Sequence, residues 1–408
     1  MSIVKRKTVY TKDDAANFEK KIQVKEVLRL LDPSFYDEYY ESLEIEEILE
    51  DYISIKGAKI LVEEVLNMEA KVEKYDIMTT SKDIILVDVL DQTKATFEIV
   101  NMKSEDVRYS GITTYSSKSD ILDKLYEVER FTNYCKKHGY GELIESLFKN
   151  LEEHNNSNET KHVIRFAKLK KTGENFIRAI VSPKYADYNI KFSVFITLIS
   201  LHKLMKADTK SIFSIRNFVI SDSEIRVNIQ KEGALNLVTG SKVTFGLQLV
   251  NDEVKRDAIK LRGIFTIEFD KDKGHGLVIQ SQTDSSTIIS IPHRQGTNVL
   301  SKLSNLDKQI QEFEKNMYQS IETIKSITKP DDVRHFLLKQ ISRAKSNDFS
   351  TIYKNEAKRI LLNTVDNILQ LLENFQKIDH LIQEEDVKAK DYIRQKLYDV
   401  LLGRRKYM

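Results

Sequence analysis

The residues best suited to chemistry lie in one segment, residues 161–189, where basic, aromatic and aliphatic side chains alternate. This pattern predicts a β-hairpin with a two-residue turn, in which Ala167 would lie opposite Arg178. In that register Arg165 and Arg178 share an otherwise apolar face. A guanidinium on such a face needs an anionic partner, because burying an unpaired charge is costly.

Two kinds of partner would satisfy these arginines. A bound phosphate suits the planar fork of a guanidinium, which donates two parallel hydrogen bonds. An internal carboxylate is the alternative, with Asp187, Glu224, Asp252 or another carboxylate of the chain as the partner. The sequence therefore leaves a ligand site and a structural ion pair both open for Arg165 and Arg178.

The opposite face of this hairpin is expected to present Lys168 and Lys170 beside Phe166. Cations interleaved with an aromatic ring are typical of single-stranded nucleic-acid platforms, because bases stack on the ring while the cations contact phosphates. The same pattern occurs on ordinary solvent-exposed strands. The candidate nucleic-acid contacts, from this hairpin and from two later basic groups, are Arg165, Phe166, Lys168, Lys170, Lys171, Arg178, Lys184, Tyr185, Lys255, Arg256, Lys260, Arg262, His293 and Arg294.

The two later groups have structural alternatives of their own. The group at residues 255–262 is interleaved with Asp252, Glu253 and Asp257, so a solvated face with local ion pairs would also explain it. His293 and Arg294 lie in a short connection where they could reach an anion, although a single histidine beside an arginine is often structural.

No catalytic or metal-binding motif stands out. The eight histidines are scattered, and Cys135 is the single cysteine, which favours a reducing compartment. Neither a phosphate-binding glycine loop, nor the dinucleotide glycine fingerprint, nor a nucleophile elbow is present. The sequence therefore indicates no metal and no cofactor. It leaves enzymatic activity uncertain, because a site could be assembled from distant carboxylates and the two arginines.

The sequence pattern around these residues predicts an α+β fold in three parts. Residues 1–154 form an acidic, mainly helical part with a small β-hairpin in residues 84–101, and an Asn- and Ser-rich linker follows it. Residues 160–296 form a basic part with an antiparallel sheet and one apolar helix in residues 191–207. Residues 297–408 form a helical stem.

The helical stem carries two apolar stripes with the spacing of coiled-coil seams. The first runs through residues 299–327 and the second through residues 361–382, each for about three heptads. Such stripes predict either a hairpin of long helices within the chain or self-association through this stem. Both alternatives remain open at this stage.

Three segments, FIRAIVSPKYADYN, LQLVNDEVKRDAIKLRGIFTIEF and PHRQG, are followed by the helical tail. Together they resemble the phage/plasmid-like protein family with domain of unknown function 932, over roughly residues 160–300. The residues that fit its two motifs are Arg178, Ala179, Ser182, Tyr185 and Asn189, then Asn251 and Glu253. The chain departs from the family at Tyr188, at Asp252 and in the order of His293 and Arg294. The family has no settled activity, so the resemblance implies a mobile-element origin.

These observations predict an accessory protein of a phage or mobile element that binds nucleic acid, preferentially single-stranded, without catalysis, in support of recombination or replication. The alternative is an oligomeric protein-interaction factor, in which the acidic segment at residues 44–51 would bind a host or phage protein. The sequence has no apolar run long enough to span a membrane and no signal-peptide pattern. A location in the cytoplasm of a bacterial host is therefore expected.

Overall fold

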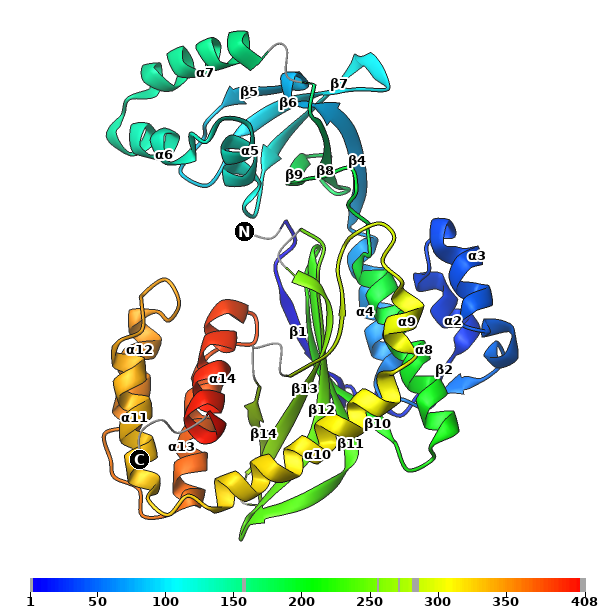
Figure 1. Ribbon diagram of the computed structural model, residues 1–408, viewed down its shortest axis with the longest axis vertical. Coiled ribbons are helices and arrows are strands. Elements are labelled where there is room, and N and C mark those ends of the chain that lie inside the picture. The colour runs from blue at the N-terminus through cyan, green and yellow to red at the C-terminus, as the bar shows by residue number, and fades with distance from the viewer. Residues whose placement is uncertain (1–2, 156–158, 255–256, 271, 281–285, 404–408) are drawn as a thin grey trace.

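The computed structural model describes residues 3–155, 159–254, 257–270, 272–280 and 286–403 (Figure 1). The chain has the expected α+β fold, with two β-sheets that lie in separate lobes. Figure 1 shows the smaller lobe at the top, joined to the larger body through β4.

The larger sheet has seven strands, in the order β1-β10-β11-β12-β13-β14, with β15 paired to β13. Its strands are β1 Lys7–Tyr10, β10 Phe213–Ile220, β11 Glu224–Val238, β12 Ser241–Asp252, β13 Asp257–Phe269, β14 Asp272–Ile279 and β15 Thr287–Ile291. Successive side chains alternate between the two faces of a strand. Along β12, Phe245 and Leu247 therefore lie on an apolar face, whereas Thr244 and Gln248 lie on a polar face.

Helices of the body cover the apolar face of this sheet. The expected apolar helix is α8, Ile190–Ala207, and its side chains are buried along most of its length. It begins at Asn189, whose side chain accepts a hydrogen bond from the backbone nitrogen of Phe192 at 2.9 Å. The N-terminal elements of the body are η1 Thr11–Asp13, α1 Ala15–Phe18, β2 Ile22–Gln23, α2 Val24–Val27, η2 Leu28–Leu30, α3 Pro33–Ser42, η3 Ile45–Ile48, β3 Tyr52–Ile53 and α4 Ala58–Glu69, and among them η2 and α4 pack against α8.

The smaller lobe is built on a six-stranded sheet in the order β4-β8-β9-β7-β6-β5. Its elements are β4 Val72–Thr80, η4 Ser81–Asp83, β5 Ile84–Asp88, β6 Thr96–Asn101, β7 Ser104–Thr113, α5 Ser117–Tyr126, α6 Glu129–His138, α7 Gly141–Asn155, β8 Lys161–Leu169 and β9 Asn175–Val181. The hairpin expected in residues 84–101 is confirmed as β5 and β6. Three helices pack on the sheet, and Ile121, Cys135 and Phe148 belong to the shared core.

This lobe, residues 72–181, is an insertion between α4 and α8. The boundary expected between residues 154 and 160 falls inside it, because β4 pairs with β8 from Val72 opposite Leu169 to Thr80 opposite Lys161. Strands from both sides of that boundary thus share one sheet. The boundary expected between residues 296 and 297 coincides with the change from strands to helices.

β8 and β9 form the expected hairpin with a different register. The loop spans residues 170–173, so Ala167 lies opposite Phe176 and the predicted pairing with Arg178 was wrong. Shifting the pairing by two residues keeps each side chain on its face. Arg178 is also the extra residue of a β-bulge, which re-aims its side chain. Arg165 and Arg178 both bond to Glu253, Arg165 to its carbonyl oxygen and Arg178 to its carboxylate.

The helical stem consists of α9 Val299–Leu303, α10 Leu306–Lys325, α11 Pro330–Ser342, α12 Thr351–Ile360, α13 Ile368–Leu381 and α14 Val387–Leu402. The first apolar stripe packs on the larger sheet, where the rings of Phe313 and Phe245 lie 5.7 Å apart. The second stripe was expected to be one helix, which was wrong for Leu361 and Val365: both lie in the connection before α13. Both stripes are buried within one chain, so intramolecular packing accounts for them.

Candidate functional site at the junction of the lobes

The residues that carry the family resemblance meet where the two lobes join. At the centre lies Glu253, which follows β12 and has a fully buried side chain. Arg178 Nη2 donates to its Oε2 at 2.6 Å, and the backbone nitrogen of Ile190 donates to its Oε1 at 2.8 Å. Lys74 Nζ lies 2.9 Å from Oε2. One carboxylate thus binds both sheets and the first turn of α8.

Electrostatics keeps these groups ionised. Burial alone would raise the pKa of Glu253, but the charges of Lys74 and Arg178 outweigh it and hold that pKa far below its usual range. The same attraction raises the pKa values of Lys74 and Arg178 against the opposing effect of burial. Lys74 has a second partner in Glu69, with 2.5 Å between Nζ and Oε1.

Arg165 makes a second set of bonds in the same place. Its Nε donates to Asp76 Oδ1 at 3.2 Å, its Nη2 lies 2.6 Å from Asp187 Oδ1, and its Nη1 donates to the carbonyl oxygen of Glu253 at 2.7 Å. The guanidinium also lies over the ring of Tyr185, 4.9 Å from its centre. Only 1% of the Arg165 side chain is exposed, so these groups enclose it.

Tyr185 and His293 stack with ring centres 5.2 Å apart and planes 4° from parallel. His293 Nδ1 lies 3.3 Å from the carbonyl oxygen of Ala186 and Nε2 lies 3.1 Å from Asn251 Oδ1; both oxygens are acceptors, so a neutral ring donates to only one of them. The amide nitrogen of Asn251 donates to the carbonyl oxygen of Tyr188 at 2.9 Å. Burial lowers the pKa of His293, which favours the neutral ring.

This arrangement selects one of the two alternatives that the sequence left open. Internal carboxylates neutralise both arginines: Asp76 and Asp187 pair with Arg165, and Glu253 pairs with Arg178. Of the carboxylates named from the sequence, Asp187 is confirmed as a partner. The other two act elsewhere, because Glu224 pairs with Arg6 and Arg226, and Asp252 accepts a hydrogen bond from the backbone of Val254.

The other hairpin candidates divide between core and surface. Phe166 is fully buried and stacks on Tyr75 at 5.3 Å, so its ring is not open to a base. Lys168, Lys170 and Lys171 are exposed at the hairpin tip. Within the part of the chain that the structure describes, no carboxylate pairs with these three lysines, so the tip keeps its positive charge.

The remaining candidates do not form one surface. Lys184 and Arg294 are exposed beside the junction, where the backbone nitrogen of Gln295 donates to the carbonyl oxygen of Lys184 at 2.9 Å. On β13, Lys260 is half-buried and Arg262 is buried. Lys255 and Arg256 lie outside the described residues. Of the candidates that the structure describes, it therefore brings together Arg165, Arg178, Tyr185 and His293 around Glu253.

An exposed aromatic and basic surface on α6 is a feature that the sequence reasoning missed. Thr132 and Cys135 face the core, and the opposite side of the helix is exposed. Tyr134 is 55% exposed and Tyr140 is 48% exposed, with His138 between them at 4.5 Å from Tyr134 and 6.2 Å from Tyr140. We call this surface the α6 patch; it comprises Arg130, Phe131, Tyr134, Lys136, Lys137, His138 and Tyr140.

The local sequence does carry a signal for the α6 patch. Arg130, Tyr134, Lys137 and His138 follow the i, i+4, i+7, i+8 spacing of one helical face. Gly139 then ends the helix in the left-handed region at φ 77°, which turns Tyr140 back beside it. In the described ranges of the chain, the cations of this patch have no carboxylate partner.

Comparisons with protein-family models, with curated proteins and with solved structures gave no match to this chain. The resemblance to the phage/plasmid-like family therefore stays a prediction. Within the described residues, no helix combines the length and the apolar character needed to cross a bilayer. The same residues contain no group of three or more His, Cys, Asp or Glu side chains placed to hold a metal ion.

Proposed function

We propose that the protein binds single-stranded nucleic acid without catalysis, through the α6 patch. The observation that carries this proposal is the cluster of exposed rings, Tyr134, His138 and Tyr140, bordered by cations that have no carboxylate partner in the described chain. Bases of any sequence stack on such rings, and the cations contact phosphates. In duplex DNA the bases are already stacked, so the rings favour single strands.

The hairpin tip offers a weaker second contact for the same ligand. Lys168, Lys170 and Lys171 would contact phosphate, but Phe166 is buried and cannot add stacking. Contact with the tip alone would therefore not distinguish single strands from duplex. The family resemblance implies a mobile-element origin. We therefore propose that single-strand binding supports recombination or replication of such an element.

Fluorescence anisotropy with labelled single-stranded DNA, single-stranded RNA and duplex DNA over a salt series tests this proposal. We expect single-strand binding that weakens steeply with salt, because phosphate contacts release counterions. Replacing both Tyr134 and Tyr140 by alanine should weaken it about tenfold or more, since each stacked base contributes about 1–3 kcal/mol. Tyr318→Ala is the matched control, because Tyr318 on α10 is also 55% exposed.

Two further measurements separate the possible surfaces. A variant with alanine at Lys168, Lys170 and Lys171 should retain its preference for single strands and lose only part of its salt dependence. If this variant loses binding while the double tyrosine variant keeps it, the hairpin tip is the site and the α6 patch is not. Absence of binding at low salt would refute both surfaces.

A second candidate function, a protein-interaction factor, is favoured by the acidic surface of α3 and η3. Some of its carboxylates are neutralised within the chain: Glu44 pairs with Lys203, and Asp51 with Lys206. Others are exposed and have no cation partner within the described ranges; these are Asp37, Glu38, Glu41 and Glu47. Lysine substitutions at Glu38 and Glu41 should abolish co-purification of a basic partner while leaving the melting temperature unchanged.

A further inference from the structure

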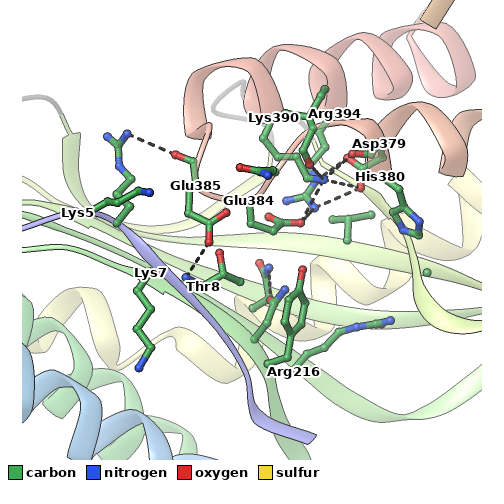
Figure 2. Close-up of a pocket in the computed structure, with 18 residues that line it drawn as sticks. Lys5, Lys7, Thr8, Arg216, Asp379, His380, Glu384, Glu385, Lys390 and Arg394 are labelled. Carbon is green, nitrogen blue, oxygen red and sulfur yellow. Dashed lines mark hydrogen bonds and ion pairs between the residues drawn. The ribbon is translucent and has the colours of Figure 1, made fainter. Parts of the chain in front are cut away.

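A cleft of about 690 Å³ lies between β1, the polar face of the larger sheet and helices α13 and α14 (Figure 2). Its volume is within the range of roughly 300–1,000 Å³ that holds small-molecule ligands. Six basic and three acidic residues line it. The cleft is in the body of the molecule, away from the α6 patch in the smaller lobe (Figure 1).

The floor of the cleft is a row of polar side chains that crosses neighbouring strands. Tyr10 lies opposite Asn217, which lies opposite Asn228, which lies opposite Gln248. Gln248 Nε2 donates to Asn228 Oδ1 at 2.9 Å, and Asn228 Nδ2 donates to Asn217 Oδ1 at 2.7 Å. All donors point toward Asn217, and its own Nδ2 has no protein acceptor within the described residues. The row thus ends at Asn217, a cleft-lining residue whose Nδ2 can donate a hydrogen bond to a ligand.

One wall of the cleft is fixed by a buried ion cluster. Arg394 Nε lies 3.1 Å from Asp379 Oδ1, and its Nη2 lies 2.6 Å from Glu384 Oε1. Lys390 Nζ donates to the carbonyl oxygen of Asp379 at 2.6 Å. Two cations and two carboxylates neutralise one another. The next residue, Glu385, accepts a hydrogen bond from the backbone nitrogen of Thr8 at 3.0 Å. This bond connects the wall to β1, so no ligand is needed to hold the two together.

Arg216 on the opposite wall is less well neutralised. Its side chain is 13% exposed, and its one ion pair in the described chain, to Glu268 at 3.2 Å, has a carboxylate that is 42% exposed. Burial lowers the pKa of Arg216 despite Glu268, whereas Asp379 and Glu384 outweigh burial at Arg394 and raise its pKa. Arg216 therefore has donors and charge left over for an anion.

Two of the cations lie toward opposite ends of the cleft. Figure 2 shows Arg216 toward one end and Lys5 toward the other, with Lys390 and Arg394 of the ion cluster between them. Lys5 and Tyr10 are five positions apart in the sequence, which corresponds to about 16 Å of extended chain. A single phosphate would fill only one end of such a cleft. A longer ligand is needed to cover the floor, where amides can pair with the edges of a base and the ring of Tyr10 can contact its face.

We propose that this cleft binds a nucleoside phosphate, with the phosphate against Arg216 and the nucleoside along the row of Tyr10, Asn217 and Asn228. The chain lacks a glycine-rich phosphate loop, so side chains supply the phosphate contacts. The proposal is independent of nucleic-acid binding, because the two surfaces lie in different lobes and share no residue.

Isothermal titration calorimetry of the full chain with ATP, GTP, CTP and UTP tests the proposal. Unphosphorylated nucleosides and inorganic triphosphate serve as separate probes. Arg216→Gln should weaken nucleotide binding about tenfold or more, because a charge-assisted hydrogen bond is lost. Arg359→Gln is the matched control, since Arg359 is a 79% exposed arginine on α12 with its own carboxylate partner. The Tyr134/Tyr140 double alanine variant should bind nucleotide as the wild type does.

Binding that is saturable, absent for nucleosides and selectively weakened by Arg216→Gln supports the site. Binding of nucleotide that is equal in Arg216→Gln and wild type would overturn it, as would no binding of any nucleotide. Triphosphate bound as tightly as nucleotide would overturn the nucleoside part. If Arg216→Gln melts at a lower temperature without ligand, Arg216→Lys replaces it, because lysine keeps the charge beside Glu268 but lacks the planar fork that binds phosphate through two hydrogen bonds, so nucleotide binding should still weaken.

Discussion

Replacing Glu253 by glutamine should be among the most destabilising single changes in this chain. The substitution keeps the shape of the side chain and removes its charge. Arg178 then loses its only carboxylate partner in the described chain, at 2.6 Å, while Lys74 keeps Glu69. Removing one partner of a buried ion pair costs about 3–5 kcal/mol, because the other charge stays buried. We expect the free energy of unfolding to fall by that amount.

Equilibrium unfolding in urea measures this loss, followed by far-UV circular dichroism because the chain contains no tryptophan. The matched control is Glu356→Gln, which removes the carboxylate of an exposed pair with 3.8 Å between the Arg359 and Glu356 side chains. That change should cost less than about 1 kcal/mol. A double variant, Arg178→Met with Glu253→Gln, should be more stable than the two single losses added together predict.

The pH dependence of the free energy of unfolding tests the role of the Glu253 carboxylate in a second way. The pKa of Glu253 is lowered in the folded state, so its contribution is complete above the pKa of an unfolded glutamate and is lost as the pH falls below that value. The difference in stability between wild type and Glu253→Gln should therefore shrink under acidic conditions. A loss below about 1 kcal/mol at neutral pH, equal to that of the exposed control, would refute the reasoning, because the pair would then behave as an exposed one.

Two further predictions concern residues of the smaller lobe. Phe166→Ala should lower the free energy of unfolding by about 3–5 kcal/mol, as measured by urea unfolding, and leave single-strand affinity of the folded protein unchanged, because the buried ring stacks on Tyr75. Weaker binding without lost stability would instead place that ring at the nucleic acid. Burial lowers the pKa of His162 to about 4, and Ser81 Oγ lies 2.8 Å from its Nε2. The unfolded state therefore takes up this proton first as the pH falls from about 6.5, and stability should drop by about 3 kcal/mol by pH 4. His162→Gln should remove that part of the pH dependence, and an unchanged slope would contradict the assignment.

The sequence predicted what depends on local pattern. The hairpin of β8 and β9 follows from alternation and turn composition, and the apolar helix α8 follows from its length and even hydrophobicity. The bulge at Arg178 left no signal in the pattern, so the register was wrong. The α6 patch does have a local signal, the helical spacing of its basic and aromatic residues.

What the sequence could not supply depends on contacts between distant segments. The partners of Arg165 are Asp76, from β4, and Asp187, from the loop after β9. No spacing rule relates these positions, because β4 reaches β8 only by pairing across three intervening strands and three helices. The cleft is a stronger case, since its lining runs from Lys5 to Arg394. Cavities built from both ends of a chain have no sequence signature.

The position of the resemblance motifs bears on what they mean. The smaller lobe leaves the body after α4 and returns to it before α8, so the chain crosses between lobes twice. Lys74 lies just after the first crossing, Asn189 lies at the end of the second, and Glu253 bonds with Lys74 and with the first residue of α8. Arg178 joins the same carboxylate from β9. Arg178 and Glu253, the two charged residues among those that fit the motifs, therefore help to hold the two lobes together, because each charge is met by another within the chain. We therefore propose that ligands are recognised on the α6 patch, whose cations have no carboxylate partner in the described chain, and at Arg216 in the cleft, whose one ion pair there is to the exposed carboxylate of Glu268.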